Sequence, residues 1–136
     1  MTTAPISPVT GKPMVRDTRS MELKYKGQAE MIQMPGWYCQ DSGESIHTGE
    51  DMKVSDAALK SLKIKVENLL SPEEIKQIRQ KLGLTQREAG EFIGGGPNAF
   101  QKYECGETLL SKGMSNFLRV LEKHPEEVRF LKDKVA

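Results

Sequence analysis

The sequence predicts an α+β protein with a small β-rich N-terminal domain followed by an all-α domain of five helices. Two observations predict this division. Before about residue 50, apolar residues alternate with charged ones between turn-forming glycines and prolines, which is typical of strands. After Ser55, apolar residues recur at helical spacing, and helix-capping residues separate successive segments. We therefore expect the two domains to cover residues 1–68 and 69–136.

The first half of the chain contains short predicted strands and turns. Apolar and charged residues alternate over residues 21–25, and Lys26-Gly27 predicts a turn into a second strand over residues 29–32. Pro35-Gly36 is expected to break the chain after that strand. So short a β segment cannot enclose a large hydrophobic core. We therefore expect it to need a cross-link or packing against a neighbouring element for stability.

The second half begins with two helices whose limits are marked in the sequence. An amphipathic helix is predicted over about residues 50–68. The next helix begins at Ser71-Pro72, because serine caps a helix, proline suits its first position, and Glu74 completes a capping box. Gly83 closes this helix.

A pair of short helices follows. Thr85 and Glu88 form a second capping box, and the three glycines at 94–96 must stop the helix that it opens. Pro97 is expected to start the next helix, which Cys105-Gly106 ends. Two further helices are predicted over residues 112–123 and from 125 to about 134.

Two short capped helices joined by a tight glycine turn, with helices on both sides, predict a helix-turn-helix motif. Such a motif places its second helix in the DNA major groove while the first crosses the sugar-phosphate backbone. The outward residues Asn98, Gln101 and Lys102 are therefore the predicted base contacts, because amide and ammonium groups match the edges of adenine and guanine. The inward residues of the same helix are expected to be Ala99, Phe100 and Tyr103.

Phosphate contacts are expected from the preceding helix and its surroundings. Gln86 lies in the first helical turn, where backbone N–H groups face outward. Thr85, Arg87 and Lys81 are further phosphate candidates. Residues 76–102 contain five basic residues and two acidic ones, a local excess that favours phosphate contact. The five basic residues are Lys76, Arg79, Lys81, Arg87 and Lys102. On charge alone, a solvated helix face explains this excess equally well.

The composition limits the class of protein. Hydrophobic residues make up 37% and charged residues 29% of the 136 residues, which fits a globular chain. We find no apolar run of membrane-spanning length and no secretory signal pattern, so a cytoplasmic protein without membrane contact is expected. Two cysteines form no disulfide framework. A nucleophile–base pair and a nucleotide-binding loop are also not recognisable, so we do not expect an enzyme.

Two resemblances sharpen this prediction. The segment 84–90, with Tyr103-Glu104 and Gly106, resembles the Xre/Cro family of helix-turn-helix domains. The segments 92–104 (FIGGGPNAFQKYE) and 118–125 (LRVLEKHP) resemble MqsA-type antitoxins of bacterial toxin–antitoxin operons. The second resemblance implies two activities, which are neutralising a ribonuclease-type toxin and repressing the operon.

The MqsA resemblance also implies how these activities are divided. The N-terminal domain is implied to bind the toxin, and the C-terminal domain to form a homodimer that binds a palindromic operator. Asn98 matches the base-reading asparagine of the family. Lys102 stands where the family commonly has a base-reading arginine, and lysine keeps the charge but loses the rigid fork.

The same resemblance implies zinc in an N-terminal domain of zinc-ribbon-like layout, bound by two Cys-x-x-Cys pairs. In this chain the four ligand positions are Ser7, Thr10, Cys39 and Ser42. Structural zinc prefers thiolate and imidazole ligands, so three hydroxyls are poor substitutes, and His47 does not complete the set. We therefore expect no metal or other cofactor, with hydrogen bonds and apolar packing in the place of zinc.

Several alternatives stay open at this point. The chain could be a stand-alone Xre-like regulator whose N-terminal domain senses something other than a toxin, or an interaction module without DNA binding. Trp37-Tyr38 fits a pair of core anchors best, although aromatic residues are also favoured at interfaces. The dimer contact is expected on the last helix or on the apolar stripe formed by Met114, Phe117 and Leu121.

Overall fold

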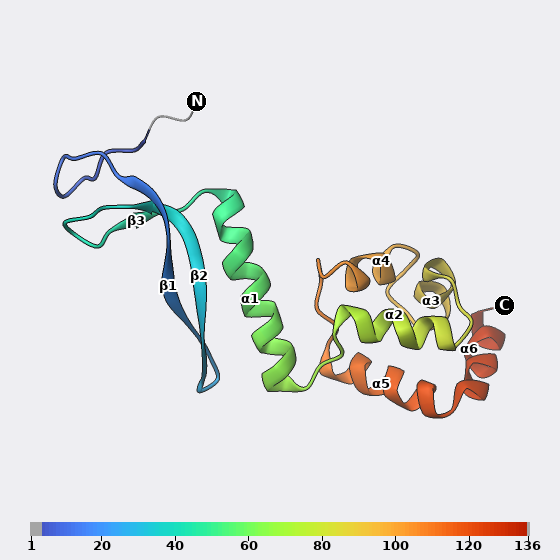
Figure 1. The fold of residues 1–136 in the computed structure, drawn as a ribbon. Coiled ribbons are helices and arrows are strands. Elements are labelled where there is room, and N and C mark those ends of the chain that lie inside the picture. Colours follow the sequence, from blue (N-terminus) through green and yellow to red (C-terminus); the bar gives the residue numbers. More distant parts are fainter. Residues whose placement is uncertain (1–3, 136) are drawn as a thin grey trace. The chain divides into compact units, whose positions relative to one another are not determined.

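The computed structural model of the chain describes residues 4–135 and divides into two compact units, which separate at Leu62 and Lys63. The N-terminal unit contains a three-stranded antiparallel sheet in the order β1-β2-β3. Helices make up the C-terminal unit (Figure 1). The predicted α+β class is therefore confirmed.

A long hairpin forms most of the sheet. β1 (Val15–Tyr25) and β2 (Gln28–Tyr38) pair along their whole length, and β3 (Ser45–Ile46) adds two residues beside the end of β2. The predicted turn is present, with φ values of 47° at Lys26 and 80° at Gly27. Two positive φ values are typical of the hairpin turns whose twist matches that of the strands. Both strands extend well beyond the predicted ranges.

The prediction that Pro35-Gly36 breaks the chain was wrong. Both residues lie inside β2, opposite Thr18 and Asp17 of β1. Proline is tolerated in a sheet where no neighbouring strand needs its N–H, and β3 pairs only with the last two residues of β2. A Cβ atom on Gly36 would lie 2.5 Å from the Nδ1 atom of His47, so this glycine makes room for the imidazole ring.

A buried carboxylate joins β1 to the start of α1 (Gly49–Glu67), which runs beside β2 in Figure 1. The side chain of Asp51 accepts hydrogen bonds from both terminal nitrogens of Arg16 and from the Thr48 N–H. The Asp51 N–H in turn donates to the Thr48 hydroxyl, 3.2 Å away. Asp51 is only 2% exposed. These contacts hold its pKa well below the usual carboxyl value, with Arg16 as the main cause.

Acid is therefore expected to destabilise the N-terminal unit through Asp51. A carboxyl whose folded pKa is lowered contributes stability above its unfolded pKa of about 3.9 and loses that contribution as the pH falls through the folded value. Asp51→Asn should lower the unfolding temperature at neutral pH and flatten its decline between about pH 5 and pH 2. Trp37, the single tryptophan, lies in β2 and reports this unit by fluorescence.

The matched control is Asp56→Asn, an exposed carboxyl on the same helix. It should leave both the unfolding temperature and its pH dependence near those of the wild type. If the unfolding temperature of Asp51→Asn depended on pH as that of the wild type does, the hydrogen bonds of Asp51 would contribute nothing to the acid sensitivity of this unit.

Five α-helices surround one hydrophobic core in the C-terminal unit, which confirms the predicted five-helix architecture. They are α2 (Pro72–Lys81), α3 (Gln86–Phe92), α4 (Ala99–Glu104), α5 (Lys112–Lys123) and α6 (Val128–Val135). The core residues are Leu70, Ile75, Ile78, Leu84, Ala89, Phe100, Leu110, Leu118, Leu121 and Val128. Within the described residues, none of the helices combines the length and apolar character needed to cross a membrane.

Both predicted capping boxes are present. The Ser71 hydroxyl accepts from the Glu74 N–H, the Thr85 hydroxyl accepts from the Glu88 N–H, and each glutamate carboxylate accepts from the N–H of its capping residue. These interactions depend on residues three apart, so the sequence alone could predict them.

The limits of two later helices differ from the prediction. α4 begins at Ala99 rather than Pro97, because the glycine turn ends only where the Ala99 N–H donates to the Gly96 carbonyl. The last predicted helix is divided into a 3₁₀ turn (Pro125–Glu127) and α6, with His124 in a non-helical conformation before the turn.

The apolar stripe proposed for the dimer contact is only partly at the surface. Leu121 belongs to the core, and Met114 packs against it. Phe117 is 37% exposed and Val120 on the same helix is 55% exposed. The side chain of Leu121 is buried inside the unit and is not available as a dimer contact, whereas Met114 is only partly buried.

Candidate nucleic-acid interface

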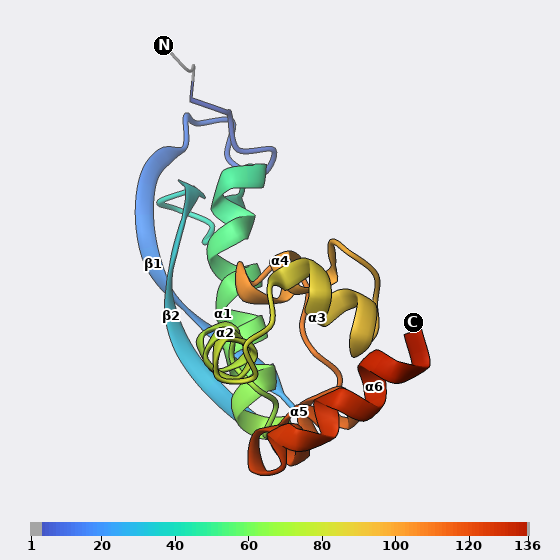
Figure 2. The ribbon, with the colours of Figure 1, turned by 90° about the vertical axis from the view of Figure 1, so that its right-hand side faces the viewer.

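The turn between α3 and α4 folds back onto α3 at Gly90. The Gly96 N–H donates to the Gly90 carbonyl over 3.2 Å. A Cβ atom on Gly90 would lie 1.8 Å from the Gly96 oxygen, so only glycine fits there. The three turn glycines 94–96 all have positive φ values. This close approach sets the position of α4 beside α3, as Figure 2 shows.

A buried ion pair fixes α4 against α2. The guanidinium of Arg79 donates from Nε and one terminal nitrogen to the two carboxylate oxygens of Glu104, over 2.7 and 2.9 Å. Its other terminal nitrogen donates to the Leu84 carbonyl over 2.9 Å. The side chains of Arg79 and Glu104 are 11% and 5% exposed. The hydrogen bonds to Glu104 raise the pKa of Arg79.

Gln86 connects this ion pair to α3. Its side-chain amide donates to the same Glu104 carboxylate over 3.2 Å. The predicted phosphate contact is therefore also an internal bridge between α3 and α4. An amide nitrogen carries two N–H donors, so one remains for a ligand.

The structure places four of the predicted DNA contacts around one hollow. Gln86 and Arg87 come from α3, and Asn98 and Gln101 come from the start and middle of α4. Asn98, Gln101 and Arg87 are exposed, and Gln86 is half-buried. Residues predicted separately as base and phosphate contacts thus share one surface.

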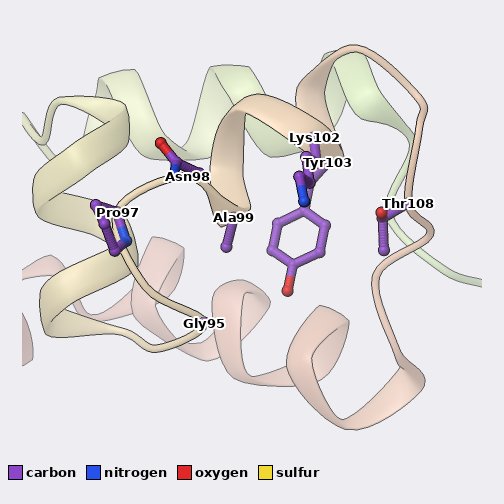
Figure 3. A pocket seen from close by; sticks show the side chains of 7 residues that line it. All are labelled: Gly95, Pro97, Asn98, Ala99, Lys102, Tyr103 and Thr108. Atoms are coloured by element: carbon purple, nitrogen blue, oxygen red, sulfur yellow. The ribbon is translucent and has the colours of Figure 1, made fainter.

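Lys102 lies on an adjoining hollow, which it shares with Asn98. Figure 3 shows Asn98 on the loop that enters α4 and Lys102 on α4, with the Tyr103 ring beside Lys102. The remaining lining residues of this hollow are Gly95, Pro97, Ala99 and Thr108. We call the surface formed by Gln86, Arg87, Asn98, Gln101 and Lys102 the α3–α4 face.

The last two predicted phosphate contacts, Thr85 and Lys81, line neither of these two hollows. The Thr85 hydroxyl serves as the helix cap described above. Lys81 is exposed in the last turn of α2.

The basic surface is smaller than the sequence count suggests. Arg79 is buried against Glu104 and does not belong to it. Arg87 is exposed but forms an ion pair with Glu91 over 3.2 Å. Lys76, Lys81 and Lys102 are exposed. The local excess of positive charge available to a phosphate therefore rests mainly on these lysines.

Sequence reasoning missed the roles of Arg79 and Gly90. Arg79 pairs with a residue 25 positions away, and a contact of that range leaves no periodic pattern in the sequence. A glycine inside a capped helical segment was the available signal for Gly90, because glycine is unfavourable there unless backbone approaches closely.

The four N-terminal positions implied for zinc do meet in space. Thr10 Oγ1 lies 3.5 Å from the Cys39 sulfur, and the hydroxyls of Ser42 and Ser7 also hydrogen bond to that sulfur. These hydrogen bonds, from Ser42 first, lower the pKa of the Cys39 thiol to about 6. Residues 4–135 contain no group of three or more His, Cys, Asp or Glu side chains that could hold a metal ion.

His47 does not join this group. Its Nδ1 lies 2.8 Å from the Pro35 carbonyl oxygen and its Nε2 lies 3.0 Å from the Ser45 hydroxyl. One thiol and three hydroxyls do not match the donors that structural zinc prefers, so these residues do not fit the metal.

Comparison with known proteins identifies the family. The family described as the antitoxin component of a bacterial toxin–antitoxin system, MqsA, matches residues 6–132. Antitoxin MqsA of Escherichia coli (strain K12) is 36% identical over 115 residues, which are 83% of this chain and 88% of that protein. The type II methyltransferase M.MspI of Moraxella sp is 36% identical over 61 residues, but these are only 14% of that enzyme. The protein therefore belongs to the MqsA family of antitoxin components of bacterial toxin–antitoxin systems.

Proposed function

We propose that this protein is a cytoplasmic antitoxin that also represses its own operon. Residues 1–68 would neutralise a ribonuclease-type toxin. Residues 69–136 would form a homodimer that binds a palindromic operator. Membership of the MqsA family supports the antitoxin role. The observation that carries the DNA-binding role is the meeting of Gln86, Arg87, Asn98 and Gln101 around one hollow.

In this proposal α4 enters the major groove. The Asn98 amide would bond to the N6 and N7 edge of adenine, and Gln101 can recognise the same edge one helical turn later. Lys102 would reach guanine as a single point charge rather than as the fork of an arginine. Gln86 and Arg87 would hold phosphates on either side of the groove and so set the register of α4.

A homodimer supplies the two reading helices that a palindrome requires. Half-sites of a helix-turn-helix dimer lie about one DNA turn, roughly 34 Å, apart. Phe117 and Val120 on α5 and Phe130 on α6 expose apolar side chains in the unit proposed to dimerise. These three side chains are the contacts that we propose, because burying them between two copies removes apolar surface from water.

Asn98→Ala is expected to weaken operator binding by about 1–3 kcal/mol for each half-site, since a good bidentate base contact contributes that amount. Binding should also weaken steeply as salt is raised, because phosphate contacts release counterions. Both effects are measurable by fluorescence anisotropy with the promoter DNA of the operon.

The control for this measurement is Gln33→Ala, which truncates an exposed amide in β2 and should leave operator binding unchanged. Equal binding by Asn98→Ala and the wild type would contradict the placement of α4 in the groove.

Co-purification with the product of the adjacent gene tests the antitoxin role. We expect a stable complex in which the ribonuclease activity of that product is blocked. Operator binding without such a complex would indicate a stand-alone regulator. A complex without operator binding would indicate an interaction module.

A further inference from the structure

Two turns of the N-terminal unit have the same internal hydrogen bonds. In the turn at residues 7–12, the Ser7 N–H donates to the Lys12 carbonyl and the Gly11 N–H donates to the Ser7 carbonyl, both over 2.9 Å. In the turn at residues 39–44, the N–H of the first residue, Cys39, donates to the carbonyl of the sixth, Glu44, over 2.9 Å. The N–H of the fifth residue, Gly43, donates to the Cys39 carbonyl over 3.3 Å. The two turns therefore repeat one backbone design.

The likeness extends to the side chains and to the glycines. The fourth residues, Thr10 and Ser42, each accept a hydrogen bond from the N–H two positions later, over 3.3 and 3.4 Å. The fifth residues, Gly11 and Gly43, have φ values of 71° and 74°. The Thr10 hydroxyl of the first turn contacts the sulfur of Cys39, which is the first residue of the second turn.

Two side-chain contacts link one turn to the other. The Thr10 hydroxyl contacts the Cys39 sulfur over 3.5 Å, and Lys12 Nζ donates to Asp41 Oδ2 over 2.8 Å from one turn to the other. Ser7 and Cys39 are 1% and 3% exposed. The Thr10 contact therefore lies beside buried residues, whereas the Lys12–Asp41 ion pair lies at the surface.

We propose that the turns at residues 7–12 and 39–44 form a metal-free joint, in which hydrogen bonds to the Cys39 sulfur take the place of the zinc that the family resemblance implies. Hydroxyl groups keep their protons at neutral pH and can share a hydrogen bond with sulfur, whereas a closed zinc site needs thiolate or imidazole at each position. The N-terminal unit should therefore fold without metal. It should also become a zinc site when the hydroxyls are replaced by thiols.

The test compares the wild type with a triple variant, Ser7→Cys, Thr10→Cys and Ser42→Cys, both in a Cys105→Ser background that removes the exposed thiol elsewhere. Each protein is purified without chelator, and its metal content is measured by elemental analysis. Cobalt titration then follows the visible absorption of a tetrahedral thiolate site. We expect no stoichiometric metal in the wild type and about one metal ion per chain in the triple variant.

Chelation separates the two proteins further. Unfolding followed by Trp37 fluorescence should not change when a strong chelator is added to the wild type, and it should shift to lower temperature in the triple variant. About one zinc per wild-type chain, or destabilisation of the wild type by the chelator, would overturn the proposal. A folded triple variant that binds no cobalt would contradict the metal-site shape of the turns.

Cys39→Ser gives a third measurement that does not depend on the triple variant. In a hydrogen-bonded joint a serine hydroxyl can accept the same hydrogen bonds, so the unfolding temperature should change little. In a metal site, loss of the strongest ligand would unfold the unit, because structural zinc binding contributes directly to folding. A large loss of stability in Cys39→Ser, together with a wild type that added zinc stabilises, would also overturn the proposal.

Discussion

Glu104→Ala is expected to lower the free energy of unfolding of the C-terminal unit by about 3–5 kcal/mol, because removing one partner of a buried pair leaves the other charge uncompensated. The carboxylate of Glu104 accepts hydrogen bonds from Arg79 and from Gln86, and so it joins α2, α3 and α4. Urea unfolding followed by far-ultraviolet circular dichroism measures this loss, since most of the helices lie in this unit.

A matched control is the exposed pair of Arg87 and Glu91. Glu91→Ala breaks an ion pair four residues apart on one helix, and exposed pairs contribute about 0–1 kcal/mol. The double variant Arg79→Met with Glu104→Leu should regain much of the stability that Glu104→Ala loses, because both charges are then absent from the core. If Glu104→Ala costs no more than Glu91→Ala, the buried pair does not hold the helices together.

Gly90→Ala is expected to displace the turn before α4 and to abolish specific operator binding. The added methyl would lie 1.8 Å from the Gly96 oxygen, and both atoms belong to main-chain positions that cannot rotate away. Overpacking against a fixed neighbour costs about 1–3 kcal/mol, and here the neighbour is the segment that positions α4. Thermal unfolding and promoter-binding titrations measure the two effects separately.

The control for this substitution is Gly113→Ala on α5, where a Cβ atom would meet nothing within 4 Å. That change should stabilise the unit by up to about 1 kcal/mol, since alanine favours helix more than glycine does. Normal operator affinity in Gly90→Ala would show that the turn can shift without moving the reading helix.

This chain differs from the family that it resembles at the positions implied to bind zinc. The sequence shows that the ligand residues are missing, but it does not show whether the positions still meet. The structure places the Thr10 hydroxyl 3.5 Å from the sulfur of Cys39, and the two turns have the same backbone hydrogen bonds.

Local chemistry was enough to determine much of this protein from its sequence. The two capping boxes, the Lys26-Gly27 turn and the helical periods predicted the elements, because each depends on residues a few positions apart. The three glycines likewise predicted the break that separates α3 from α4.

Only the tertiary structure decided which residues hold the elements together. Arg79 is counted as surface charge in the sequence but is buried against Glu104. Pro35 is a chain breaker by propensity but lies within a strand whose outer edge needs no donor there. In each case the outcome depends on neighbours brought close by folding, and burial and hydrogen bonding to those neighbours outweigh a local preference of about 1 kcal/mol.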